Sequence, residues 1–145
     1  MRFREIDFKF KNINLYFCEY LKMSNHEQLP LYLKFYKLTK VLYMITKNFP
    51  KQYKYTLGQS VLDLLWQCID TILEINVLSD NKKYFKILEL STVLDKFKIR
   101  LRMAQEIGLI SENQFSHIQI NFVKEIGEMI GGWLRWSKKQ VIALN

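Results

Sequence analysis

The chain has 145 residues, of which 22 are basic and 14 acidic, and its formal net charge is +8. This length fits one domain with a sizeable core, and a hydrophobic content of 49% excludes a disordered chain. No apolar run reaches the ~18 residues that a membrane span needs, and the two cysteines form no CxxC pair, so we expect a reduced, cytoplasmic protein with no membrane partner. The basic excess suits a nucleic-acid partner, although a lysine-rich surface on an ordinary soluble protein is nearly as common.

The first 28 residues differ in pattern from the rest of the chain. Apolar and polar residues alternate over residues 6–10 and 13–17, which is the period of a β-strand. The segment is compatible with a hairpin, with a strand that leads into a helix, or with a leader in front of a natural start at Met23. The sequence leaves these alternatives open.

The next two segments are helical in pattern. Apolar residues at spacings of three and four predict a first helix that ends before Pro50, since proline disfavours a helical residue in front of it. A second helix is predicted from about Lys51 to Leu78, and it carries two apolar stripes on different sides. One stripe is enough to close a bundle, so the second stripe predicts that this helix is covered from both sides. The second stripe consists of Leu62, Trp66, Ile69 and Leu73.

A third and a fourth helix follow. The third is predicted from about Lys82 to Ile107, with Gly108 as a left-handed cap behind it. The fourth begins at Ser111, where Gln114 completes a capping box, and its apolar stripe occupies positions 115, 118, 122, 126, 129, 133 and 136.

The glycines of the fourth helix carry a further prediction. Gly127 and Gly131 stand four residues apart, so both face the same way and favour close packing against another helix. Four helices with short loops predict an all-α, antiparallel up-down-up-down four-helix bundle over residues 29–139, which assembles as an oligomer. Residues 1–28 precede this bundle as an extension, and residues 140–145 follow it as a tail.

No residue pattern identifies an enzyme or a metal site. His26 and His117 have no HxxxH or ExxH partner, and Cys68 lies in a core stripe where a buried thiol is the ordinary role. No serine or cysteine stands near a histidine and an acid that would form a triad, and no P-loop or GxGxxG is present. We therefore expect a non-enzymatic protein that uses no cofactor.

Charge alternates by helix, basic in the first, acidic in the second and basic in the third. Inside a bundle these charges would pair intramolecularly, and on a symmetric oligomer they would form a continuous basic band; the two interpretations have about equal weight. Tyrosines interleave with the lysines of the first helix and would suit stacked bases, although half-buried tyrosines at helix contacts are the more common case. The basic residues predicted to contact nucleic acid or a protein partner are Lys37, Lys40, Lys47, Lys51, Lys54, Lys96, Lys98, Arg100 and Arg102.

Two apolar residues of the third helix stand between its basic ridges. Ile99 and Met103 face away from the core stripe, and apolar residues with a charged surround are typical of an interface centre. Together with the second stripe of the second helix, they define the predicted oligomer contact. Its residues are Leu62, Trp66, Ile69, Leu73, Ile99 and Met103.

Three stretches of the chain resemble the accessory variability determinant (Avd) proteins of diversity-generating retroelements. These stretches are FPK entering YTLGQ at residues 49–59, LRMA leading to GLIS at residues 101–111, and EIGEMIGGW at residues 125–133. The similarity covers about residues 29–139. The broader group includes four-helix proteins encoded in ribosomal-RNA intervening sequences, whose second helix usually ends in an Ala-Asn-Ile-Ala-Glu-Gly type of run. This chain has ILEIN at residues 72–76, which favours the retroelement branch.

The resemblance implies a non-enzymatic, basic, barrel-like homopentamer. Such a protein binds RNA or DNA and a reverse transcriptase, and it is needed for the mutagenic copying of a template RNA. The resemblance also implies a contact site late in the third helix, at Lys98 and Arg102, where lysine in place of an expected arginine at 98 weakens bidentate phosphate binding. The alternative is a helical protein–protein interaction module of the intervening-sequence type without direct nucleic-acid binding.

Overall fold

The structure is a computed structural model that describes residues 29–143, and every regular element in this range is helical. The alternatives for residues 1–28 lie outside the described residues. The first helical arm of the bundle is α2 (Leu29–Thr46). The second arm is continuous from α3 (Lys51–Tyr53) through a π-helical turn, η1 (Lys54–Gly58), into α4 (Gln59–Asn76).

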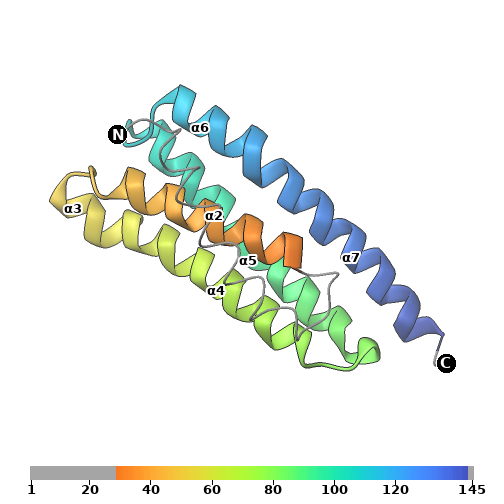
Figure 1. The fold of residues 1–145 in the computed structure, drawn as a ribbon. Helices are drawn as coiled ribbons and strands as arrows, with labels where there is room; N and C mark the ends of the chain where they lie inside the picture. Colours follow the sequence, from red (N-terminus) through yellow and green to blue (C-terminus); the bar gives the residue numbers. More distant parts are fainter. Residues whose placement is uncertain (1–28, 144–145) are drawn as a thin grey trace, which may run out of the picture.

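The third arm starts with a 3-10 turn, η2 (Asp80–Lys82), and continues as α5 (Lys83–Glu106). The fourth arm consists of α6 (Glu112–Ile118), a second π-helical turn η3 (Gln119–Val123) and α7 (Lys124–Ile142), so it continues beyond the predicted boundary at Lys139. Figure 1 shows the four arms side by side, with the α3 end of the second arm and the start of α6 at the same end of the bundle.

Each arm packs against two neighbours. α4 packs against α2 and α5, and α7 packs against α5 and α2 (Figure 1). The chain therefore passes from corner to corner of the bundle in order, which places α2 diagonally opposite α5 and α4 diagonally opposite α7. The predicted all-α four-helix bundle is confirmed.

The apolar stripes predicted for the first three arms form most of the core. Burial of such side chains contributes roughly 1.5–3 kcal/mol each, and this contribution fixes which face of each helix turns inward. The largest fully buried side chains of these arms are Phe35, Leu38, Leu42, Leu65, Ile72, Ile75, Ile87, Leu90, Phe97 and Leu101.

In the fourth arm the core stripe departs from the sequence prediction. The expected succession was Ile118, Phe122 and Ile126, but Val123 is buried and Phe122 is half-buried. Because the π-turn η3 inserts an extra residue into the helix, the next buried position, Val123, comes five residues after Ile118. Ile126 is fully buried as predicted, and the stripe then continues at a buried Ile130 in place of the predicted Met129.

Local signals at the loop between α5 and α6 are confirmed. Gly108 has φ = 82°, the left-handed conformation that ends α5, and the N–H groups of Leu109 and Ile110 donate to the carbonyl of Ala104. The Ser111 hydroxyl accepts from the N–H of Gln114, whose side-chain oxygen accepts from the N–H of Ser111. This capping box satisfies amides that the first turn of the helix leaves without partners.

The prediction of close helix packing at the glycines of the fourth arm is wrong within one chain. A Cβ atom at Gly127 would meet nothing within 4 Å, and one at Gly131 would meet only Nη1 of Arg135, at 3.7 Å. The neighbouring helices pack most closely around Ile126 and Ile130, about a quarter turn of α7 away from the glycines, because these large side chains form the core. Among the described helices, none is long and apolar enough to cross a membrane.

Candidate functional site

The basic residues predicted on the first two arms lie at the surface. Lys37, Lys47 and Lys51 are exposed and Lys54 is half-buried. Within residues 29–143, no carboxylate forms an ion pair with any of these four lysines. Among the described residues, their charge is therefore not neutralised by a carboxylate.

Lys40 differs from the other lysines of α2. Its Nζ lies 5.0 Å from the centroid of the Tyr36 ring, at the distance of a cation–π contact, and burial lowers its pKa. Tyr36 in turn stacks on Tyr32, with 6.2 Å between the ring centroids. These tyrosines thus have partners on their own helix, as expected for rings at a half-buried helix surface.

Part of the intramolecular pairing that the sequence left open occurs within α5. Nζ of Lys98 lies 3.1 Å from Oδ1 of Asp95, and Nε of Arg102 lies 2.8 Å from Oε1 of Glu106. Such exposed pairs contribute only about 0.3–0.5 kcal/mol, so a phosphate can displace the carboxylate at little cost.

The remaining two basic residues of this site are Lys96 and Arg100. Lys96 is exposed, and Nη1 of Arg100 donates to its carbonyl at 3.2 Å. The four predicted contact residues on α5 therefore stay at the surface, whereas Lys83 at the start of this helix is buried.

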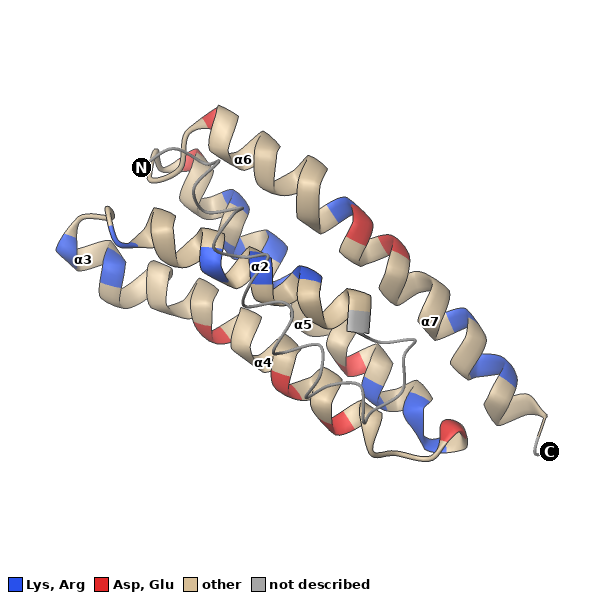
Figure 2. Ribbon diagram, viewed as in Figure 1, with Lys and Arg blue, Asp and Glu red and all other residues tan. Residues whose placement is uncertain are grey.

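The two basic helices do not share one face of the chain. α2 and α5 lie at opposite corners, and α4 stands between them with a row of exposed acids, Asp63, Asp70 and Glu74 (Figure 2). Lys47, Lys51 and Arg102 belong to the same end of the bundle, because α2 and α5 end there and α3 begins there. The single chain therefore brings the predicted contact residues together only at this end.

Four of the six residues of the predicted oligomer contact are exposed in the structure, and two are buried. Trp66 and Leu73 are 41% and 43% exposed, and Ile99 and Met103 are 68% and 49% exposed. The other two residues of the set, Leu62 and Ile69, are buried, so the prediction that they form an oligomer contact is wrong.

Leu62 and Ile69 retain only 6% and 2% exposure, because they lie in the core of their own chain. A helix in a four-helix bundle has two neighbours, and much of the second stripe of α4 faces one of them. Trp66 stays outside and donates from Nε1 to the hydroxyl of Tyr43 on α2, at 3.0 Å. Among the described residues, an α2/α4 surface with Tyr43, Trp66 and Leu73 therefore stays exposed.

Sequence reasoning missed most of a second apolar stripe on α5. Ile99 and Met103 continue at helical spacing in both directions, on the side opposite the core, so α5 is apolar on two faces. The signal was present in the spacing, but Lys96 and Asp95 interrupt it. We call this set the outer α5 stripe; its exposed residues are Phe85, Leu88, Ile99, Met103 and Ile107.

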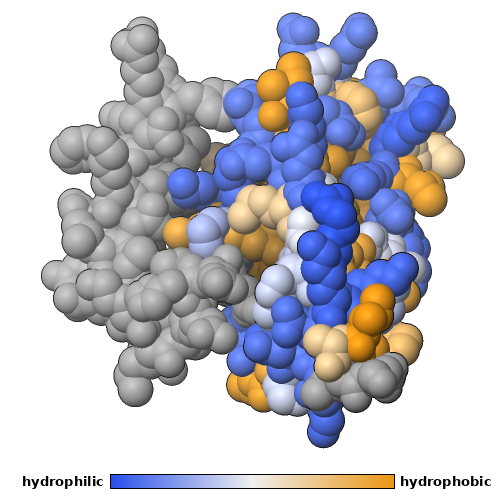
Figure 3. Space-filling view, turned by 90° about the vertical axis from the view of Figure 1, so that its right-hand side faces the viewer, coloured by the Kyte–Doolittle hydropathy of each residue, from blue (hydrophilic) through white to orange (hydrophobic). Residues whose placement is uncertain are grey.

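The surface is otherwise hydrophilic. Figure 3 shows hydrophilic side chains over most of the described part of one face, with hydrophobic side chains as separate patches among them. Within residues 29–143, no group of three or more His, Cys, Asp or Glu is placed to hold a metal ion. Burial raises the pKa of the Cys68 thiol to about 12, which makes it a poor nucleophile at neutral pH. What the described surface offers is cationic and apolar contact area.

Comparison with known proteins gives one match. No curated protein and no solved structure matches the chain. A model of the bAvd-like family matches residues 31–137, which cover most of the chain and all four helical arms. This range includes the FPK…YTLGQ, LRMA…GLIS and EIGEMIGGW stretches. The chain therefore belongs to the bAvd-like family, the bacterial accessory variability determinants of diversity-generating retroelements.

Proposed function

We propose that this protein is a basic, oligomeric scaffold that binds nucleic acid, the template RNA or its cDNA, together with a reverse transcriptase, and so supports mutagenic retrohoming. The observation that carries the proposal is the two separate sets of exposed cations, one on α2 and one on α5, within a member of the bAvd-like family. The protein contributes no chemical step in this function. It holds the nucleic acid and the transcriptase together.

The proposed binding mechanism is electrostatic. Exposed lysines such as Lys37, Lys47 and Lys96, which have no carboxylate partner among the described residues, neutralise phosphates and release their condensed counterions. Family membership supports the reverse transcriptase as the protein partner.

Oligomerisation would join the basic areas that lie apart on a single chain. Each chain exposes two different apolar faces, the outer α5 stripe and the α2/α4 surface with Trp66 and Leu73. If the first face of one copy packs against the second face of the next copy, the contact is head-to-tail. Such contacts close into rings when the rotation between copies allows it, and we propose a homopentamer. In a ring, the basic residues at opposite corners of each bundle repeat around the assembly and form a continuous band.

A binding titration over a range of salt concentrations tests the function. We expect the logarithm of the association constant for single-stranded RNA to fall linearly with the logarithm of salt concentration, with a slope of about 0.7 per neutralised phosphate. Binding that does not change with salt contradicts the electrostatic mechanism.

The second candidate is a protein–protein interaction module without direct nucleic-acid binding. The ion pairs of Lys98 with Asp95 and of Arg102 with Glu106 favour it, since they occupy the two cations at the implied contact site. A gel shift with RNA at moderate salt separates the two functions, because only the scaffold retards the RNA.

A further inference from the structure

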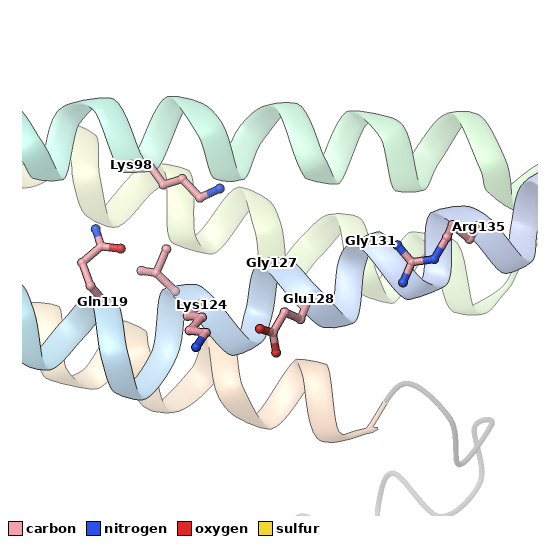
Figure 4. A pocket seen from close by; sticks show the side chains of 8 residues that line it. Lys98, Gln119, Lys124, Gly127, Glu128, Gly131 and Arg135 are labelled. Carbon is pink, nitrogen blue, oxygen red and sulfur yellow. The ribbon is translucent and has the colours of Figure 1, made fainter.

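A groove of ≈ 640 Å³ lies between α5 and the fourth arm. Gly127 and Gly131 line it, and Figure 4 shows both on the stretch of α7 that faces the groove. Glycine destabilises a helix interior relative to alanine. A Cβ atom at Gly127 would meet nothing within 4 Å, so packing among residues 29–143 does not account for the absence of a side chain. We call this cavity the glycine groove.

The helix that lines the glycine groove is also irregular next to it. The π-turn η3 supplies the lining residues Gln119 and Val123. π-turns are rare, and they occur frequently at functional sites because they redirect side chains. The π-turn and the glycines lie at different positions along the fourth arm, and both line one cavity.

The charge of the groove is positive. Lys98 reaches it from α5, Lys124 stands on the first turn of α7, and Arg135 lies back along α7 toward Gly131 (Figure 4). Glu128 is the one carboxylate among the lining residues. Within the described range, Lys124 and Arg135 form no ion pair.

The Lys98 cation is only loosely held. Its partner Asp95 keeps 65% of its side chain exposed, so this pair is a weak one. The groove therefore presents three cations to a ligand and opposes them with one lining carboxylate.

We propose that the glycine groove binds the phosphodiester backbone of a single nucleic-acid strand, a proposal that rests on the function proposed above. Three lining cations complement phosphates, and the missing side chains let a sugar–phosphate chain lie against α7 within reach of Lys98 and Arg135. None of the described residues that line the groove is aromatic, so they give bases no ring to stack on and the contact is independent of base sequence. A volume of ≈ 640 Å³ is that of a small-ligand pocket and accommodates a few nucleotides of one strand, not a duplex.

The test fills the groove without harming the helix. Gly127→Leu combined with Gly131→Leu introduces two good helix formers, one where a Cβ atom meets nothing within 4 Å and one where it meets only Nη1 of the flexible Arg135 side chain, at 3.7 Å. The melting temperature should therefore equal or exceed that of the unmodified protein. Binding is measured by the fluorescence anisotropy of a labelled single-stranded 12-mer, as RNA and as DNA of the same base sequence. We expect the double variant to lose affinity by about tenfold or more, and Arg135→Ala to reduce the salt slope by about 0.7.

Two further variants make the test specific. Gly132→Leu is the matched control, because Gly132 does not line the groove and a Cβ atom there would meet only Nη2 of Arg135, at 3.8 Å. It should bind as the unmodified protein does. Glu128→Gln removes the lining carboxylate and should raise affinity for both oligonucleotides.

The outcomes separate this inference from the proposed function. If the unmodified full chain binds neither RNA nor DNA, the proposed function fails, and the inference fails with it. If the full chain binds but the groove-filling variant binds as Gly132→Leu does, only the inference is overturned. If the groove-filling variant loses affinity and its mass by light scattering also falls, the groove is a contact between copies and the inference is overturned. Competition by inorganic polyphosphate supports recognition of phosphate alone.

Discussion

Lys98 and Arg102 each hold a carboxylate of their own helix, Asp95 at 3.1 Å and Glu106 at 2.8 Å. Both carboxylates are more than half exposed, and Arg102 itself keeps 74% of its side chain exposed. A pair of this kind restrains a side chain weakly, since water screens both charges. At this scale, an intramolecular partner does not prevent a residue from binding a phosphate.

We expect the double change Lys98→Ala and Arg102→Ala to weaken association with RNA or with the reverse transcriptase and to reduce the salt slope for single-stranded RNA by about 1.4. Helix content by circular dichroism should be unchanged, because both side chains lie outside the core. The control is Lys86→Ala on the same helix, where Nζ lies 2.6 Å from Glu74 and 3.0 Å from Glu89. A loss of helix content in the double variant would make these residues structural.

Cys68 provides a readout of the core. Burial raises the pKa of its thiol to about 12, so at pH 8 only about one molecule in ten thousand carries the reactive thiolate. In a Cys18→Ser background, we expect a thiol reagent to label Cys68 slowly in the folded protein and at once in urea. Rapid labelling without denaturant would show that α4 separates from its neighbours.

At the scale of the element, α5 is the helix with two apolar sides. Phe97 and Leu101 are fully buried, whereas Ile99 and Met103 on the other side are about half exposed or more. The buried side is covered by the other arms of the same bundle. No described residue covers the outer α5 stripe. Substitutions only two residues apart on α5 should therefore differ in their effect on the free energy of unfolding.

We expect Phe97→Ala to lower the free energy of unfolding by about 3–5 kcal/mol, because it leaves a cavity in the core. Ile99→Asp should change it by less than about 0.5 kcal/mol under conditions where the protein is monomeric. Urea denaturation at low protein concentration measures both. A large loss of stability for monomeric Ile99→Asp would place Ile99 in the core after all.

At the scale of the whole molecule, the diagonal placement of α2 and α5 keeps the two basic helices apart. The acidic row of α4 separates the two basic helices on one side of the bundle (Figure 2). One chain therefore offers a polyanion separate basic areas, whereas several copies in a ring would offer a continuous one. Linked contacts of this kind raise affinity far above that of a single contact.

Light scattering coupled to size exclusion should give a mass that is a multiple of the 17.5 kDa chain, and five copies are expected. Ile99→Asp with Met103→Asp should reduce the mass to that of one chain, because two charges then stand at the centre of the contact. RNA affinity should fall with the mass. If the unmodified protein remains a single chain at high concentration, the proposal of an oligomeric scaffold is contradicted.

Much of the fold was predictable because its signals are local. Proline and glycine stops, the capping box at Ser111 and the three- and four-residue spacing of apolar residues each act within a few positions along the chain. The surface position of the basic residues of the candidate site was predictable for a different reason, since burial of a charge is costly and such side chains are mostly exposed. Lys83 is an exception in this chain, because it is buried beside Asp80. These features follow from the sequence by itself.

The tertiary structure decided the features that depend on neighbours. A π-turn cannot be detected from a 3.6-residue period, so the shift of the core stripe at Val123 became visible only in the fold. Leu62 and Trp66 belong to the same stripe in sequence, yet only the positions of the neighbouring helices bury Leu62 and leave Trp66 outside. The groove at Gly127 likewise depends on where α5 passes. Spacing along a helix specifies which residues share a face, and only packing between helices determines what that face meets.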